Sequence, residues 1–265
     1  MANTSRQALH GRHALVTGAG SGIGAAIASA LVEAGAHVTL AGRRAAPLDE
    51  LADRLGAQQC LALPGFDVTD PSAIATGLGR ARSAFGPIEI LVNNAGEAPT
   101  ASFEKTTLEM WNHVMAVDLT GVFSVTQAVL ADLKAKGDGA RIITIASTAG
   151  LTGYAYVSAY CAAKHGIIGL TRSLALELAK TGVTVNAVCP GFTDTPLVAR
   201  SLDTIMQKTG RSQAEALQEL TKHNPQGRLV TPEEVADTVL WLASPSARSI
   251  TGQAIAVAGG EVFSG

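Results

Sequence analysis

Residues 13–35 read HALVTGAGSGIGAAIASALVEAG, and this stretch decides the fold. A short β-branched strand runs into a cluster of glycines, and an apolar helix follows that ends at Gly35. Strand, glycine turn and helix in this order begin a βαβ unit. Backbone N–H groups and the helix dipole at such a turn can hold a pyrophosphate, which a side chain would keep away. Because many tight turns are glycine-rich for conformational reasons alone, the position of the cluster inside this unit carries the prediction of a dinucleotide site.

The rest of the chain repeats the alternation of strands and helices. Further strands are expected at residues 37–42, 60–68, 88–96, 141–148, 183–191 and 253–259. Helices are expected between them, at residues 47–56, from Pro71 onward, and at 107–137, 158–180 and 231–244. The pattern predicts a single-domain α/β fold of the Rossmann type, with a doubly wound parallel sheet of about seven strands, right-handed crossovers and helices on both faces.

The composition fits one soluble domain that spans residues 1–265. Of these residues 47% are hydrophobic and 16% charged, so one extensive core can form. No apolar run approaches the ~18 to 20 residues that a membrane-spanning helix needs. The start, MANTSRQALHGRH, has polar residues where a secretory signal has its apolar core. We therefore expect a cytoplasmic protein without a membrane partner.

Charge and cysteine content exclude two further classes of function. A formal net charge of −2 argues against a nucleic-acid-binding surface, which would show a concentrated basic stripe. The three cysteines, Cys60, Cys161 and Cys189, are widely spaced, so the pattern indicates neither a disulfide framework nor a zinc site. We expect reduced, mostly buried thiols and no metal.

Residues 195–227 interrupt the alternation. This polar stretch contains Gly210 and Pro225 and precedes the helix expected at 231–244. Long insertions in compact domains are usually functional loops or mobile segments, so we interpret the stretch as a small helical lid over the substrate. The alternative is a helical hairpin without a role in binding.

Four motifs follow the glycine turn along the chain. They are Asn93-Asn94-Ala95-Gly96, Ser147, Tyr160-xxx-Lys164 and Pro190-Gly191, each at the end of an expected strand or the start of a helix. Together with the spacing Gly18-xxx-Gly22-x-Gly24, they resemble the short-chain dehydrogenase/reductase family over essentially the whole chain. The resemblance implies the strand order 3-2-1-4-5-6-7 and an NAD(P)-dependent oxidoreductase acting on a CH–OH group. It is closest to 3-oxoacyl (acyl-thioester) reductases and polyketide-type ketoreductases.

The spacing of Tyr160 and Lys164 places both side chains on one helix face. A tyrosine has a free pKa of about 10, so proton exchange near neutrality requires a cation that stabilises the phenolate, and Lys164 meets that need. Without the other motifs, a packed tyrosine ring and a solvated lysine would be the better interpretation. By the resemblance, Ser147 binds the substrate oxygen, Tyr160 protonates it, and Lys164 also binds the nicotinamide ribose.

Asp118 departs from the family pattern. The segment Asp118-Leu119-Thr120-Gly121-Val122-Phe123 carries an aspartate where the family usually has an asparagine. In the family the backbone carbonyl of that residue anchors a water that leads to the lysine. An ionised carboxylate cannot donate a hydrogen bond as an amide can, and it favours a protonated Lys164. We expect catalysis to persist with a modified proton relay.

The end of the second strand indicates the cofactor. It reads Ala41-Gly42-Arg43-Arg44, without the carboxylate that would accept from a ribose 2′-OH, so NADP(H) is favoured and NAD(H) stays possible. The alternative is that both arginines merely solvate the start of a helix.

By the resemblance, Asp67 and Val68 contact the adenine. Asp67, Thr193 and Thr195 can equally be turn or cap residues. The full set of expected cofactor-binding residues is Gly18, Ser21, Gly22, Ile23, Gly24, Arg43, Arg44, Asp67, Val68, Asn94, Ala95, Gly96, Tyr160, Lys164, Pro190, Gly191, Phe192, Thr193 and Thr195.

The substrate stays open at this level. The residues expected to shape its site are Glu97, Ala98, Ser147, Thr148, Leu151, Tyr154, Tyr156, Tyr160 and Phe192, together with the lid. The leading hypothesis is an NADP(H)-dependent reductase of a 3-oxoacyl thioester or related ketone. The alternatives are an NAD-dependent secondary alcohol or hydroxyacyl dehydrogenase and a catalytically inactive dinucleotide-sensing protein.

Three remaining expectations concern the surface. His113 and His165 lack a matching constellation and are interpreted as surface or packing residues. On the long helix at 107–137, residues such as Trp111, Phe123 and Val125 that do not face the sheet are expected to form a contact between subunits. We expect a homo-oligomer, a tetramer or a dimer.

Overall fold

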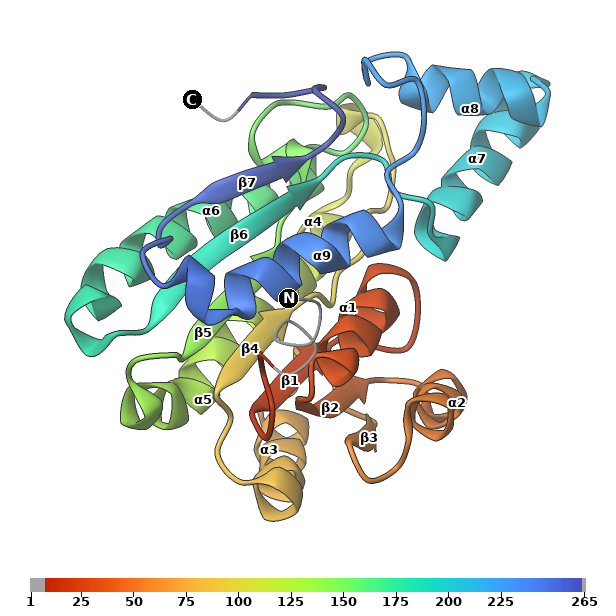
Figure 1. Ribbon diagram of the computed structural model, residues 1–265. Helices are drawn as coiled ribbons and strands as arrows, with labels where there is room; N and C mark the ends of the chain where they lie inside the picture. Colours follow the sequence, from red (N-terminus) through yellow and green to blue (C-terminus); the bar gives the residue numbers. More distant parts are fainter. Residues whose placement is uncertain (1–7, 264–265) are drawn as a thin grey trace.

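A parallel sheet of seven strands forms the centre of the molecule (Figure 1). The computed structural model describes residues 8–263, so part of the polar start on which the expectation about a secretory signal rested lies outside the described residues. The strand order is β3-β2-β1-β4-β5-β6-β7, which confirms the order implied by the family resemblance. The strands are β1 (His13–Thr17), β2 (His37–Gly42), β3 (Cys60–Pro64), β4 (Ile90–Asn93), β5 (Arg141–Ile145), β6 (Thr184–Pro190) and β7 (Ala254–Val257).

Helices cover both faces of the sheet. One face carries α1 (Gly22–Glu33), α2 (Ala45–Leu55) and α9 (Pro232–Ala243), and α9 packs along α1. The other face carries α3 (Pro71–Phe85), α5 (Gly121–Lys136) and α6 (Ser158–Leu178), with α4 (Leu108–Met115) against α6. Each face has its own apolar core, one around Ile27 and Val239 and the other around Leu91 and Val129. The doubly wound architecture predicted from the alternation is therefore confirmed.

The strands in the middle of the sheet are buried along their whole length. Every residue of β1, β4, β5 and β6 is buried, as expected for continuous apolar runs that helices cover on both sides. Parallel pairing, for example Leu15 with Thr39 and with Leu91, brings the carboxyl ends of the strands to one edge. The motifs recognised in the sequence lie at this edge, where open α/β sheets bind their ligands.

The long helix expected at 107–137 is present but not regular. It runs from Leu108 to Lys136, and residues Ala116–Thr120 form one π-helical turn between α4 and α5. By length and composition this helix is apolar enough to cross a membrane, so the expectation that no such segment exists is wrong. In the fold it is a core helix, since Val125 and Leu133 pack under the sheet. Val125 is therefore not available for the subunit contact expected of it, because its side chain is fully buried.

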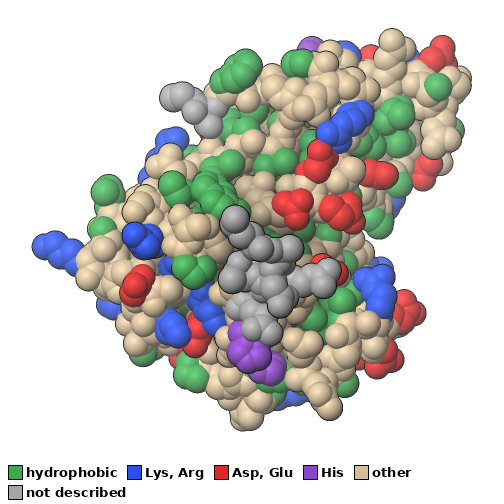
Figure 2. Space-filling view, viewed as in Figure 1, with side chains coloured by type: hydrophobic (Ala, Val, Ile, Leu, Met, Phe, Trp, Pro, Cys, Tyr) green, Lys and Arg blue, Asp and Glu red, His purple; other side chains and the backbone are tan. Residues whose placement is uncertain are grey.

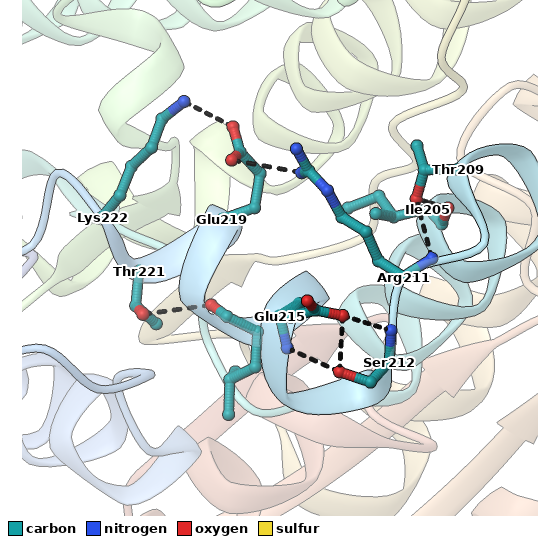
Figure 3. Close-up of polar contacts among 9 residues, drawn as sticks. Ile205, Thr209, Arg211, Ser212, Glu215, Glu219, Thr221 and Lys222 are labelled. Carbon is teal, nitrogen blue, oxygen red and sulfur yellow. Dashed lines mark hydrogen bonds and ion pairs between the residues drawn. The ribbon is translucent and has the colours of Figure 1, made fainter.

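The segment expected to be a lid folds into two helices, α7 (Pro196–Thr209) and α8 (Gln213–Thr221), which project beyond the sheet (Figure 1). Polar contacts cap α8 and line its exposed side (Figure 3). Ser212 and Glu215 form a reciprocal capping box at the start of α8, and Glu219 pairs with both Arg211 and Lys222. The alternation stops here because this pair of helices lies outside the β–α layers.

Candidate active site

The glycine turn leaves the start of α1 open. Gly18 and Gly22 adopt left-handed backbone angles, with φ of +65° and +54°. A Cβ on Gly24 would lie only 2.3 Å from the Gly18 carbonyl oxygen, so the turn and the helix pack too closely for any side chain there. Ser21 occupies the N-cap position and makes no side-chain capping hydrogen bond. The first N–H groups of α1 are therefore free of a side-chain cap and suited to an anion.

Asn94 braces this turn. Its Nδ2 donates to the carbonyl oxygens of Thr17 at 3.0 Å and Gly18 at 3.1 Å. The backbone N–H groups of Asn94 and Ala95 donate to the Thr17 hydroxyl at 3.0 and 3.1 Å. The side chain of Asn94, one of the expected cofactor-binding residues, thus holds β1 and β4 together at the carboxyl edge.

Charged side chains gather at the end of β2, where the adenosine half of a dinucleotide is expected. Arg43 is largely exposed, and its Nη2 lies 3.9 Å from Oε1 of Glu97. The same Glu97 oxygen lies 3.0 Å from Nε2 of His113. Glu97 was expected to shape the substrate site, but the structure places it with these two basic residues instead. Arg44 is the exposed N-cap residue of α2, a position that fits both a phosphate contact and a solvated helix start.

Asp67 makes a tight turn. Its Oδ1 accepts from the backbone N–H of Thr69 at 2.8 Å and from its hydroxyl at 2.7 Å. These two hydrogen bonds hold the pKa of Asp67 below its ordinary value. The neighbouring Val68 is buried in the core beside Leu78, so its side chain serves packing.

The helix α6 brings Tyr160 and Lys164 together, as the i, i+4 spacing predicts. The Lys164 Nζ lies 5.3 Å from the centre of the Tyr160 ring. Lys164 is buried, and its ammonium donates to the carbonyl oxygen of Ile145, at the end of β5, at 3.1 Å. Ser147 follows the same strand, and its Oγ accepts from the N–H of Ala149 at 3.1 Å. The three expected catalytic side chains therefore meet at the carboxyl edge of β5.

Asp118 forms a buried ion pair with Lys164. The two charged groups lie 3.2 Å apart, between Oδ1 and Nζ, and Asp118 is completely buried. Its Oδ2 accepts from the backbone N–H of Glu97 at 3.3 Å. The π-helical turn carries Asp118, and Gly96 makes room for it, because a Cβ on Gly96 would lie 2.6 Å from Oδ1.

Burial raises the pKa of Asp118, and the ammonium of Lys164 opposes that shift. Burial alone would lower the pKa of Lys164, but Asp118 and Tyr160 raise it above its ordinary value.

The effect of this pair on Tyr160 differs from the sequence expectation. Lys164 does favour the phenolate, as expected, and so does the nearby Ser147 hydroxyl. Burial has the larger effect, however, and Asp118 adds to it, so the pKa of Tyr160 lies above its ordinary value of 10.0. The expectation that Lys164 makes this phenol acidic enough is therefore incomplete, because burial outweighs the ammonium and the Asp118 carboxylate, 3.2 Å from Nζ, offsets part of its charge.

The segment after β6 lies beside the glycine turn. Thr195 caps α7 by accepting from the N–H of Val198, and its methyl group would lie 3.1 Å from a Cβ on Gly22. Thr193 is buried and its hydroxyl donates to the carbonyl oxygen of Gly191 at 3.0 Å. The cap role that was left open for Thr195 is confirmed, and Thr195 also lies beside the glycine turn.

Tyr154, Thr148 and Glu261 form a polar cluster next to Ser147, and only the first two were expected to shape the substrate site. The hydroxyl of Tyr154 lies 2.8 Å from Oγ1 of Thr148 and 2.6 Å from Oε1 of Glu261, and its ring meets Phe192 edge to face at 6.1 Å. Burial and the hydrogen bond to Glu261 raise the pKa of Tyr154, so this phenol stays protonated. Sequence reasoning missed Glu261, because no spacing rule connects a residue after β7 with the loop after β5. Tyr156 is 67% exposed and adopts φ of 69°, so its side chain lies outside this cluster.

The remaining candidates behave as surface or packing residues. His165 is exposed and its Nδ1 contacts the carbonyl oxygen of Cys161. Cys60 and Cys189 are buried and Cys161 is partly buried, as expected for packed thiols. On the face seen in Figure 2, Lys and Arg side chains are scattered among acidic and apolar ones and do not form a stripe.

Comparisons with known proteins agree with this geometry. A family model described as "Enoyl-(Acyl carrier protein) reductase" matches residues 18–261. The chain is 42% identical to D-beta-hydroxybutyrate dehydrogenase of Cupriavidus necator, over 92% of this chain and 95% of that protein. It is 39% identical to acetoacetyl-CoA reductase of Rhizobium meliloti, over 95% and 99%. A crystal structure of a variant actinorhodin polyketide ketoreductase with NADPH superposes with a TM-score of 0.88 at 38% identity, over 94% of this chain and 97% of that one. These likenesses confirm the resemblance that the motifs predicted.

Proposed function

Because this chain belongs to the short-chain dehydrogenase/reductase family, whose members are oxidoreductases, we propose that it reduces a 3-oxoacyl thioester or a related ketone with NADPH. The observation that carries the proposal is the meeting of Ser147, Tyr160 and Lys164 at the carboxyl edge of the sheet, beside a helix start without a side-chain cap. An acetoacetyl-CoA reductase and a polyketide ketoreductase among the relatives support this substrate class.

The residues of this chain fit a nicotinamide dinucleotide. The close packing of Gly24 against Gly18 and the free N–H groups of α1 suit a pyrophosphate. Arg43 and Arg44 are exposed and suited to a 2′-phosphate, whereas Glu97 beside Arg43 works against that preference. NADP(H) is therefore the proposed cofactor, and NAD(H) is the alternative. When bound, the cofactor supplies the hydride.

Each catalytic side chain has a separate task in the proposed reaction. The Ser147 hydroxyl holds the carbonyl oxygen of the substrate, and Tyr160 gives its proton to that oxygen while the carbonyl carbon accepts the hydride. Lys164 stabilises the tyrosinate that remains and holds the nicotinamide ribose. In the oxidative direction Tyr160 takes the proton from the alcohol.

Tyr160→Phe tests the proposal. With acetoacetyl-CoA and NADPH, we expect kcat to fall by about 10²- to 10⁴-fold while the Kd for NADPH changes by less than about twofold, because only the proton-transfer group is removed. Parallel assays with NADH and with a secondary alcohol plus NAD⁺ test the NAD-dependent dehydrogenase alternative. NADPH binding without turnover of any ketone or alcohol would instead indicate the dinucleotide-sensing protein.

A cytoplasmic location and a tetrameric or dimeric assembly belong to the same proposal. Phe123 on α5, Leu176 on α6 and Trp241 on α9 are exposed apolar side chains on the long helices, which supports association of copies. Sedimentation of the purified chain tests the assembly, and Phe123→Asp is expected to weaken it.

A further inference from the structure

The segment after β7 brings a carboxylate to the substrate side of the site. Glu261 lies against Tyr154, with Oε1 2.6 Å from the phenol oxygen. A carboxylate can only accept, so Tyr154 donates its single proton to Glu261, and the Thr148 hydroxyl, 2.8 Å away, is left to donate to the phenol oxygen. Thr148 directly follows Ser147, the residue proposed to hold the substrate oxygen. One chain of hydrogen bonds therefore connects Glu261 to the residue beside the reacting group.

Close packing fixes the segment that carries Glu261. Gly259, with φ of +60°, is packed so tightly that a Cβ there would lie 2.2 Å from Oδ1 of Asn224, at the end of the lid. A Cβ on Gly191 would lie 3.1 Å from Oε2 of Glu261, so the absence of a side chain at Gly191 makes room for the carboxylate. Glu261 is thus held between the loop after β5 and the loop after β6. Both of these loops carry residues proposed to bind substrate or cofactor.

Outside the lid, none of the described residues expected to shape the substrate site is positively charged. The other positions expected to shape the substrate site, Ala98, Leu151, Tyr154 and Phe192 among them, are all uncharged apart from Glu97, which contacts His113 and Arg43. The buried ammonium of Lys164 is paired with Asp118. The substrate side of the site therefore carries negative charge without a cation assigned to it.

We propose that Glu261 determines substrate specificity by excluding free 3-oxo and 3-hydroxy carboxylates, so that the site accepts their uncharged acyl forms, thioesters or esters. The inference rests on the proposed function and narrows its substrate class. The proposal places the carboxylate of a 3-oxo acid, two carbons from the reacting carbonyl, on the side of Ser147 where Thr148, Tyr154 and Glu261 lie. Two negative charges that share a partly buried site repel each other. The hydroxybutyrate dehydrogenase and the acetoacetyl-CoA reductase among the relatives are named for these two kinds of substrate.

The test compares acetoacetate with its methyl ester, which lacks the negative charge and carries one more methyl group, with NADPH as the reductant. For the unaltered protein, we expect kcat/KM for the ester to exceed that for the acid by at least about tenfold. Glu261→Gln keeps the acceptor for Tyr154 and removes the charge, so it is expected to raise kcat/KM for acetoacetate about tenfold and to change the value for the ester by less than about threefold. Glu177→Gln, on the exposed surface of α6, removes the same charge elsewhere and should leave both values unchanged.

Equal turnover of acid and ester by the unaltered protein would overturn the inference. The inference would also be overturned if Glu261→Gln left the ratio of kcat/KM for the ester to kcat/KM for the acid unchanged. Glu261→Met, which keeps the length of the side chain without charge or acceptor, is the second variant if Glu261→Gln does not fold. If the unaltered protein reduces the ester but the ratio fails these tests, the proposed function stands and only the role of Glu261 falls. If it reduces neither substrate and no acetoacetyl-CoA, the proposed function itself falls, and the inference with it.

Discussion

Asp118 adds to the effect of burial in raising the pKa of Tyr160, and it does so beside Lys164. An asparagine in this place would be neutral, and the full charge of the ammonium would then act on the phenol. The carboxylate lies 3.2 Å from Nζ, so the pair is close to neutral as seen from Tyr160. The Asp118 carboxylate is among the groups that keep the pKa of Tyr160 above its ordinary value. We therefore predict that the aspartate at this position alters the proton relay without removing any member of it.

Asp118→Asn is expected to shift the pH dependence of catalysis to lower pH. Alcohol oxidation needs the tyrosinate, so its rate rises as pH passes the pKa of Tyr160. Removing the carboxylate lowers that pKa, and the rise should therefore begin at lower pH. The measurement is kcat/KM against pH in the oxidative direction, with Asp138→Asn, at the opposite end of β5, as the control. A profile identical to that of the unaltered protein would show that Asp118 does not act on the relay.

Arg43 and Arg44 are expected to discriminate between the two nicotinamide cofactors. Replacing both by alanine removes charge-assisted hydrogen bonds to the 2′-phosphate, so KM for NADPH should rise about tenfold or more and KM for NADH should change little. Steady-state kinetics with each cofactor gives the comparison. Equal effects on NADPH and NADH would rule out recognition of the phosphate.

Glu97→Gln is expected to improve the use of NADPH, whereas the arginine replacements impair it. The carboxylate of Glu97 lies 3.9 Å from the Arg43 guanidinium and competes with a phosphate for it. Removing that charge should lower KM for NADPH by a few-fold and leave KM for NADH nearly unchanged. A change of the same size with both cofactors would mean that Glu97 does not face the 2′ position.

Among the helices and strands, those whose burial imposes a regular pattern of apolar residues could be predicted from the sequence. The strands could be predicted because helices cover both faces of β5 and β6, which makes these runs apolar throughout. The π-helical turn at Ala116–Thr120 could not, because one extra residue in a turn leaves the apolar periodicity of a long helix almost unchanged. The position of Glu261 could not be predicted either, since it depends on how the segment after β7 packs on Asn224.

The close approach of the loop after β4 to the π-helical turn gives a prediction about Gly96. Gly96→Ala places a Cβ 2.6 Å from Oδ1 of Asp118, so it should destabilise the protein by about 1–3 kcal/mol and disturb the ion pair with Lys164. Gly79→Ala is the matched control, because Gly79 is exposed within α3 and has open space around it. That change should stabilise by about 0.5–1 kcal/mol. Urea unfolding measures both, and a loss no larger than a few tenths of a kcal/mol for Gly96→Ala would contradict the packing described.

For the whole molecule, stability is expected to fall at mildly acid pH because of His13. This buried side chain donates through Nδ1 to the Gly86 carbonyl oxygen, and its Nε2 accepts from the Thr39 hydroxyl. Burial lowers its pKa below the ordinary value of 6.5. The unfolded chain therefore takes up a proton near pH 6.5 that the folded chain does not, and stability declines as pH falls from there toward the lowered pKa.

Unfolding at about pH 5.5 and about pH 7.5 measures this decline. His13→Asn should reduce the difference in unfolding free energy between the two pH values, whereas His165→Asn, at an exposed histidine, should leave it unchanged. An equal pH dependence in the unaltered protein and in His13→Asn would assign the decline to other groups.

The strand order has a consequence for how the chain reaches this state. β1 lies between β2 and β4, and two strands and three helices separate β1 from β4 along the chain. We therefore expect the contacts that Asn94 makes with Thr17 and Gly18 to form late, because they join segments far apart in the chain. During synthesis on the ribosome, the glycine turn is expected to lack these contacts until β4 has been made. Nascent chains that end before β4 should accordingly be unable to retain the dinucleotide.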